Sequence, residues 1–283
     1  MRAIEQDTNK LHIASLSGGQ DSTAMVIRML ELGYHLDYIL FCDTGAEHDE
    51  MYLYIKRVNE YLQATFNKSI TYLKGETLLD GIKKEIGERG KPENIGRPRG
   101  IPRVIGISFC TRDLKVQRIQ KFVNTLNKNP IHYIGYTSDE VKNNRGGALN
   151  RTKENYSYPL YNWGWNELHI SQFLTSIDLF NPLYNYYRRT GCFCCPKQSM
   201  DSWYSLYKNY PKHWEESKKI EKWCIDNNAK SQSFVYRRSK EDSSKMEFAT
   251  LHRLELEFKE REKQSTIFDF LSNEDQPISC LCK

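Results

Sequence analysis

Residues 17–22 read SGGQDS, and their types and spacing suit the binding of a phosphate group. They follow the apolar run LHIASL and precede an apolar pattern with helical spacing. Backbone N–H groups in a tight glycine loop that opens onto a helix form a hole for an anion. The glycines let the main chain approach the anion, and the serine hydroxyls add donors. The expected binding residues are Ser17, Gly18, Gly19, Gln20, Asp21 and Ser22.

Asp21 is the exception in this loop, because a carboxylate repels an anion. A Mg²⁺ ion that bridges Asp21 to phosphate removes the conflict. The loop also lacks the Gly-Lys-Ser/Thr ending of the common mononucleotide loop. We therefore expect a nucleoside triphosphate with Mg²⁺ rather than a bare anion. The alternative is an exposed Ser-Gly turn that caps a helix.

A second group of polar residues, DTGAE at 43–47, follows the apolar run YILFC. A continuous apolar run of this length is typical of a buried parallel strand. Ligands bind at the carboxyl ends of parallel strands, so we expect Asp43, Thr44 and Glu47 to face the nucleotide. Asp43 has an alternative role as the cap of the following helix.

Two basic residues, Arg112 and Lys115, lie in the segment FCTRDLK at 109–115. Either side chain can neutralise a phosphate or a developing anion, and arginine adds bidentate geometry. We expect a catalytic role for both. The alternative is that they belong to a solvated helix face.

The chain has eight cysteines and no apolar signal segment, which disfavours disulfides and favours metal, cluster or redox chemistry. Cys192 and Cys195 have the spacing with which two thiolates bind one metal centre, and Cys194 lies between them. The possibilities are an iron–sulfur cluster, a zinc ion, or buried cysteines that bind no metal. Cys280 and Cys282 are expected in a loose tail, as reactive thiols or as part of a ragged end.

Alternating strand and helix patterns predict an α/β fold, with a parallel sheet and helices on both faces. We divide the chain into a nucleotide-binding part, 1–196, and a helical C-terminal part with a flexible tail, 197–283. The segment 75–107 is rich in glycine, proline and basic residues and predicts a mobile loop. The expected strands are 11–16, 38–42, 69–73 and 131–136. The expected helices include 47–63, 111–126, 166–174, 200–207, 211–224 and 248–262.

Composition limits the class of protein only broadly. The 283 residues are 39% hydrophobic, which suits a packed core, and no apolar run approaches the length of a membrane span. The polar start of the chain predicts a cytoplasmic protein. The net charge of +5 fits a nucleotide or nucleic-acid ligand. The basic loop 89–103 and the aromatic stretch 156–189 could bind nucleic acid, or form a lid and an ordinary core.

The motifs resemble a known family. SGGQDS is similar to the SGGxDS signature of the PP-loop ATP pyrophosphatases, in the adenine nucleotide alpha-hydrolase superfamily. That resemblance implies cleavage of ATP between the α and β phosphates, with a Rossmann-like PP-loop fold. DTGAE and CTRDLK resemble segments of the phosphoadenosine phosphosulfate (PAPS) reductase family. So do residues 134–140 with Arg145, although Tyr136 and Thr137 depart from the pattern, and the later strings YPL and NPLY.

The resemblance covers about residues 11–200 and implies further site residues. The nucleotide-binding set gains Asp43, Thr44, Gly45, Glu47 and Arg145. Related reductases place cluster ligands at two motif positions, which implies Cys110 as a metal ligand with Cys192, Cys194 and Cys195. Phe109 stands where those reductases have another cysteine. A [4Fe–4S] cluster held by three cysteines occurs among PP-loop tRNA thiolases, while zinc or no metal stays open here.

Three functions follow from these motifs. The intact loop favours adenylylation of an acceptor followed by sulfur delivery, with Asp21 among the catalytic residues, because PAPS reductases have degenerate loops. DNA-phosphorothioation enzymes of the family make a nucleic-acid acceptor and a sulfur-donor protein the expected partners. The alternative is a reductase of PAPS or adenosine phosphosulfate (APS), in which Cys280 or Cys282 attacks the substrate and a thioredoxin-like protein resolves it. The third is a nucleotide-sensing subunit without turnover.

Overall fold

The computed structural model describes residues 6–104, 108–142, 155–239, 242 and 244–274. The chain forms two compact units, each built from two stretches. The N-terminal unit contains residues 1–84 and 102–198, and the C-terminal unit contains 85–101 and 199–283. The sequence division into 1–196 and 197–283 left 85–101 in the first part, so the two divisions differ there. We describe each unit by itself.

A five-stranded parallel sheet forms the centre of the N-terminal unit, in the order β3-β2-β1-β4-β5. The chain moves outward from β1 to β3 and then returns to place β4 on the other side of β1. The carboxyl ends of β1 and β4 therefore flank a switch in direction, which is where such sheets bind ligands. The strands are β1 (Leu11–Ser15), β2 (Tyr38–Cys42), β3 (Ile70–Leu73), β4 (Pro130–Tyr133) and β5 (Tyr156–Ser157).

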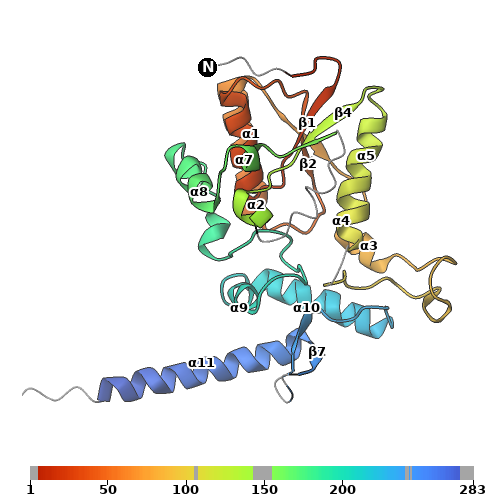
Figure 1. Ribbon diagram of the computed structural model, residues 1–283. Helices are drawn as coiled ribbons and strands as arrows, with labels where there is room; N and C mark the ends of the chain where they lie inside the picture. Colours follow the sequence, from red (N-terminus) through yellow and green to blue (C-terminus); the bar gives the residue numbers. More distant parts are fainter. Residues whose placement is uncertain (1–5, 105–107, 143–154, 240–241, 243, 275–283) are drawn as a thin grey trace, which may run out of the picture. The chain divides into compact units, whose positions relative to one another are not determined.

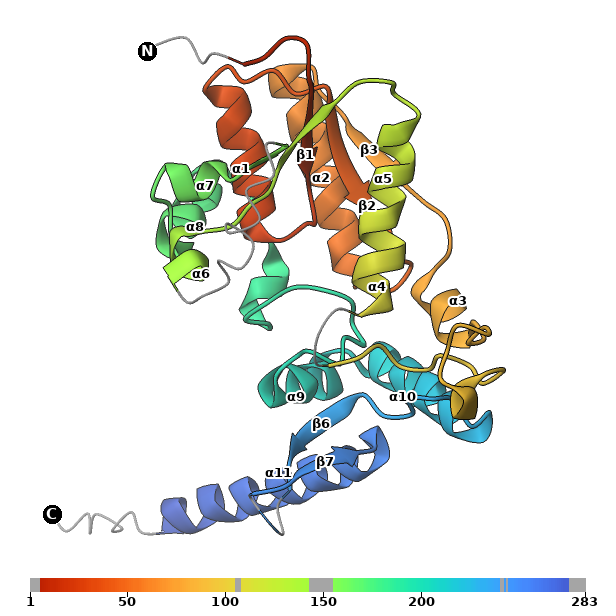
Figure 2. The same ribbon diagram turned by 45° about the vertical axis from the view of Figure 1, so that its right-hand side comes forward.

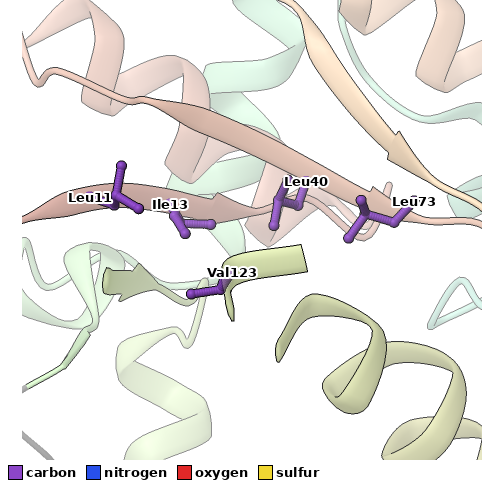
Figure 3. Packing of buried hydrophobic residues seen from close by; sticks show 5 residues of the cluster. All are labelled: Leu11, Ile13, Leu40, Leu73 and Val123. Atoms are coloured by element: carbon purple, nitrogen blue, oxygen red, sulfur yellow. The ribbon is translucent and has the colours of Figure 1, made fainter. Parts of the chain in front are cut away.

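Helices cover both faces of this sheet, which confirms the expected fold class; α1 and α5 lie on opposite sides of the strands (Figure 2). Residues of β1, β2, β3 and α5 form one buried cluster, shown in Figure 3: Leu11, Ile13, Leu40, Leu73 and Val123. The helices of this unit are α1 (Gln20–Glu31), α2 (Asp49–Phe66), α3 (Leu78–Lys83), α4 (Phe109–Thr111), α5 (Gln117–Asn124), α6 (Ser138–Lys142), α7 (Pro159–Asn162) and α8 (Glu167–Ser176).

Two sequence expectations for this unit need correction. The segment 75–107 is not one loop, because α3 forms within it behind a capping box between Thr77 and Asp80. The predicted helix 111–126 is not regular, because Arg112–Val116 is a π-helix between α4 and α5. A short 3₁₀-helix, Pro182–Asn185, follows α8.

The described residues of the C-terminal unit form three α-helices, drawn in Figure 1, and an antiparallel hairpin, whose two strands are labelled in Figure 2. The hairpin was not predicted. Its second strand includes residues 248 and 249, which were expected to begin the helix 248–262. The buried rings of Trp203, Trp214 and Phe234 pack in its core. The elements are α9 (Met200–Asn209), α10 (Pro211–Asp226), β6 (Val235–Arg238), β7 (Met246–Ala249) and α11 (Leu251–Glu274).

Residues 85–101 are held to this unit by backbone bonds. Gly100 pairs with Ser231, and the Ile101 N–H donates to the Ser231 carbonyl at 2.9 Å. Gly100 has φ +73°, and a Cβ there would lie 2.0 Å from the Ser231 oxygen, so only glycine fits. A short 3₁₀-helix, Pro92–Asn94, lies in the same segment. None of the described helices is long and apolar enough to cross a membrane.

Candidate functional site

The predicted phosphate loop connects β1 to α1. Gly18 has φ +81°, a left-handed conformation that favours glycine, and a Cβ there would lie 2.4 Å from the Met51 sulfur. Gly19 is the N-cap residue of α1 and supplies no side-chain hydrogen bond to the helix. The first amides of α1 are therefore not capped by the N-cap residue, as expected of a helix start that binds an anion.

The two serines of the loop face each other across its turn. The Ser17 N–H donates to the Ser22 hydroxyl at 3.0 Å, and the two hydroxyl oxygens are also 3.0 Å apart. The Ser22 hydroxyl in turn contacts the Gly19 carbonyl oxygen at 3.1 Å. These bonds brace the loop, so the predicted anion donors also determine its shape.

Two residues far along the chain hold the loop, and the sequence analysis gave neither a role. Asn181 is fully buried and donates from Nδ2 to the Gly18 carbonyl at 2.9 Å, while its Oδ1 accepts the Leu183 N–H. The Tyr184 hydroxyl accepts a hydrogen bond from the Gln20 N–H at 3.1 Å. Their only signal in the sequence was the NPLY string.

A cavity of about 650 Å³ opens beside the loop, at the carboxyl ends of β1 and β4. Gly135 after β4 is tightly placed there, because a Cβ would lie 3.1 Å from the Ser22 main chain. Arg188 and Arg189 line the cavity, both are exposed, and no hydrogen bond or ion pair joins either to another described residue. The other lining residues with polar side chains include Ser17, Gln20, Asp21, Ser22, Asp139, Glu140, Glu167, Tyr184 and Thr190.

A second cluster lies after β2, and we call it the thiol pocket: Thr44, Glu47, Lys115 and Cys192. The Thr44 hydroxyl donates to Glu47 Oε1 at 3.2 Å and lies 3.4 Å from the Cys192 sulfur. The Cys192 thiol donates to the same carboxylate oxygen at 3.7 Å. Glu47 is 5% exposed and pairs with Cys192 in an antiparallel bridge. None of these four residues lines the cavity.

The electrostatics of the thiol pocket favour a charged lysine and a neutral thiol. Burial opposes the charge on Lys115, but nearby negative charge, with Glu47 as its largest source, outweighs burial and raises the pKa of Lys115. Burial, with Glu47 second, raises the pKa of the Cys192 thiol. Lys115 is part of the π-helix, an irregularity that often occurs at functional sites.

Asp43 and Arg112 contact protein groups rather than the cavity. Asp43 Oδ1 accepts hydrogen bonds from the Gly45 N–H and the Tyr52 hydroxyl, each at 2.8 Å. Arg112 is exposed and donates to its neighbour Asp113 at 2.5 Å. Neither side chain caps a helix, and their predicted roles toward the nucleotide stay predictions.

The four cysteines predicted as metal ligands do not form a metal site in this arrangement. Cys110, Cys192 and Cys195 lie near enough to influence one another or Lys115 electrostatically, while Cys194 is fully buried. Among the described residues, no group of three or more His, Cys, Asp or Glu side chains is arranged to hold a metal ion. The iron–sulfur and zinc expectations stay predictions. Arg145, Cys280 and Cys282 lie outside the described residues.

Comparison with known proteins identifies the family. The model of the phosphoadenosine phosphosulfate reductase domain matches residues 12–198. The chain therefore belongs to this family, as its motifs predicted. An uncharacterized protein of Methanocaldococcus jannaschii is 26% identical over a match of 213 residues that covers 72% of this chain. The match spans only 40% of that relative's length.

Two solved structures are similar at low levels. PAPS reductase from Candida auris, in a phosphate complex, has 14% identity and a TM-score of 0.41, and the match covers 65% of this chain and 82% of that one. The U34-tRNA thiolase NcsA from Methanococcus maripaludis, with its [4Fe-4S] cluster, has 14% identity and a TM-score of 0.40, covering 79% and 76%. At this level, the chemistry of neither protein transfers to this chain.

Proposed function

We propose that the chain is an ATP-dependent enzyme that adenylylates an acceptor and so activates it for sulfur transfer. The observation that carries this proposal is the intact SGGQDS loop, which turns through left-handed Gly18 and opens onto α1 beside a cavity of about 650 Å³. A loop of this kind offers backbone donors to a pyrophosphate group. PAPS and APS carry no β-phosphate, so they would leave part of such a loop unused.

The residues of the cavity suggest how the reaction proceeds. An acceptor oxygen attacks the α-phosphorus, the bond from that phosphorus to the bridging oxygen breaks, and pyrophosphate leaves with the bonding electrons. The loop amides bind the departing pyrophosphate, which becomes more negative in the transition state. Asp21 lines the cavity next to the loop and would hold Mg²⁺, which supplies charge neutralisation when bound.

The thiol pocket has a separate role in this proposal. Its charged lysine can stabilise an anion, and Cys192 kept as a thiol is protected from reaction until a partner enters. We therefore assign Lys115 to charge stabilisation near the sulfur chemistry rather than to the pyrophosphate. Glu47 and Thr44 orient the thiol through their hydrogen bonds.

The main alternative is a sulfonucleotide reductase, which the family description itself favours. In that reaction a cysteine thiolate attacks the substrate sulfur and displaces the adenosine phosphate. A thioredoxin-like dithiol then releases sulfite and is itself oxidised to a disulfide. A nucleotide-sensing subunit is the third candidate.

One experiment separates these functions. Anaerobically purified protein is incubated with α-labelled ATP and sulfide, with and without tRNA or duplex DNA, and separately with PAPS or APS and a dithiol reductant. AMP and pyrophosphate that depend on Asp21 support our proposal, with Asp226→Asn as the control because Asp226 forms an exposed pair with Lys222 in the C-terminal unit. Sulfite that is lost in Cys280→Ser or Cys282→Ser would establish the reductase. Nucleotide binding without any product would establish the sensing subunit.

A further inference from the structure

The first amide of α1 has its acceptor in a segment more than 160 residues away along the chain. The Gln20 N–H donates to the Tyr184 hydroxyl at 3.1 Å. The Thr190 hydroxyl lies 3.5 Å from the same oxygen and donates to it. A Cβ on Gly19 would lie 3.4 Å from this oxygen, so the phenol rests against the bare main chain of the loop.

This arrangement differs from that of two other helices in the same unit. α3 and α8 begin with Thr77 and Asn166, whose own side chains accept from the helix amides. α1 begins with Gly19, which has no such side chain, and its acceptor oxygen comes from Tyr184 instead. The Tyr184 oxygen therefore lies where an anion bound to the helix start would place an oxygen.

A phosphate oxygen would bind at this position more strongly than the phenol does. Burial raises the pKa of Tyr184, so the hydroxyl is neutral at physiological pH. Hydrogen bonds to a charged acceptor are about twice as strong as those between neutral groups. Arg189 acts electrostatically on the Tyr184 oxygen, and its guanidinium pairs with no other described residue. A phosphate would gain that charge as well.

We propose that Tyr184 is a latch on the phosphate loop: its hydroxyl competes with the pyrophosphate part of ATP for the Gln20 amide, and Arg189 favours the pyrophosphate. The inference rests on the proposed function, because it assumes that this loop binds ATP. Its consequence is specificity. A nucleotide with β- and γ-phosphates displaces the hydroxyl, whereas AMP has no group to place against Arg189.

Calorimetric binding of Mg²⁺-pyrophosphate, ATP and AMP to the full chain tests the latch. Tyr184→Phe keeps the ring and removes the competing oxygen, so pyrophosphate should bind about fivefold more tightly. Arg189→Gln should weaken pyrophosphate binding by about tenfold or more and leave AMP binding unchanged. Arg28→Gln is the matched control, because Arg28 is on α1 but pairs with Glu31 and does not line the cavity.

The outcomes distinguish a failure of the latch proposal from a failure of the proposed ATP-dependent function. Unchanged or weaker pyrophosphate binding in Tyr184→Phe overturns the latch, and unchanged binding in Arg189→Gln overturns the role of Arg189. A native protein that binds neither pyrophosphate nor ATP overturns the proposed function instead.

A second measurement follows the native protein and uses Tyr184→Phe only to assign one resonance. The ¹³Cζ resonance of Tyr184, assigned by its absence from Tyr184→Phe, should shift in the native protein when pyrophosphate saturates it. A resonance that stays in place at saturation overturns the latch.

Discussion

The cavity beside the SGGQDS loop and the thiol pocket lie at the same edge of the sheet but differ in how their polar side chains are paired. In the cavity, Arg188 and Arg189 are exposed and make no hydrogen bond or ion pair with another described residue. In the thiol pocket, Thr44, Glu47 and Cys192 hydrogen-bond one another. In the cavity these two side chains are left without a partner among the described residues, whereas the side chains of the pocket are partners of one another.

Gly18→Ala, in the loop beside the cavity, should have the largest effect on activity of the substitutions considered. The added Cβ would lie 2.4 Å from the Met51 sulfur and would also strain a residue at φ +81°. A displaced loop should lower the rate of AMP formation by about 100-fold, since misplacement by about 1 Å can cost that much.

Gly33→Ala is the matched control for this change. Gly33 has φ +82° and no atom within 4 Å of an added Cβ, so it bears the backbone strain alone. It should lower the free energy of unfolding by about 1 kcal/mol and leave activity intact. Equal losses of activity in the two variants would show that the loop contact is irrelevant.

Glu221, in the C-terminal unit, is a buried carboxylate to compare with those of the N-terminal unit. It accepts hydrogen bonds from the backbone N–H groups of Phe234 and Leu251. Burial raises its pKa from 4.5 to about 7. The folded state therefore binds a proton that the unfolded state releases between these values, so stability falls as pH rises from 4.5 through 7. The loss is about 3 kcal/mol at about 1.36 kcal/mol per pH unit.

Glu221→Gln should remove most of that pH dependence, as measured by urea unfolding between pH 5 and 8 with tryptophan fluorescence. A native profile whose slope survives the substitution would contradict the assignment to Glu221.

Glu47→Ala should affect the thiol pocket itself. The change removes the acceptor of Thr44 and Cys192 and leaves the Lys115 charge without its main partner. We expect the free energy of unfolding to fall by about 2 kcal/mol. Glu31→Ala, which breaks an exposed pair with Arg28, should cost less than about 1 kcal/mol. Similar costs in both would remove the distinction between pocket and surface.

Arg112→Gln should have the smallest effect on stability, below about 1 kcal/mol, because the guanidinium is exposed and pairs with the adjacent Asp113. Any change in AMP formation in this variant would then report a catalytic role rather than misfolding. A variant that melts as the native protein does and keeps full activity would withdraw Arg112 from the predicted catalytic residues.

Much of the sheet was predictable, because β2 is a continuous apolar run and β1 a mostly apolar one, and a sheet covered on both faces buries such strands. The hairpin β6–β7 was not predictable in the same way. Its inward-facing Arg237 is kept there by ion pairs with Glu247 and Glu257, so the strand reads as polar. A prediction from hydrophobic periodicity counts Arg237 as a polar residue, because the sequence does not show that its charge is paired in the folded protein.

The place of the SGGQDS loop between a strand and a helix could be predicted from the sequence because its residues are contiguous. Tyr184 and Arg189 were missed because they reach the loop through folding and not through any local pattern. The contact between Glu47 and Cys192 was missed for the same reason: the sequence placed both near a site, but only the bridge between distant segments brings them together.

The excursion of residues 85–101 into the C-terminal unit bears on the order in which the protein can be made. The ribosome completes this segment more than 100 residues before Ser231, the residue with which Gly100 pairs. Residues 85–101 therefore cannot form these contacts until Ser231 has been synthesised, whereas the strands of the parallel sheet before and after this segment can already pair. A nascent chain that ended near residue 198 would contain residues 85–101 without the part of the C-terminal unit that they pair with. A single truncation of the chain therefore cannot separate the two units.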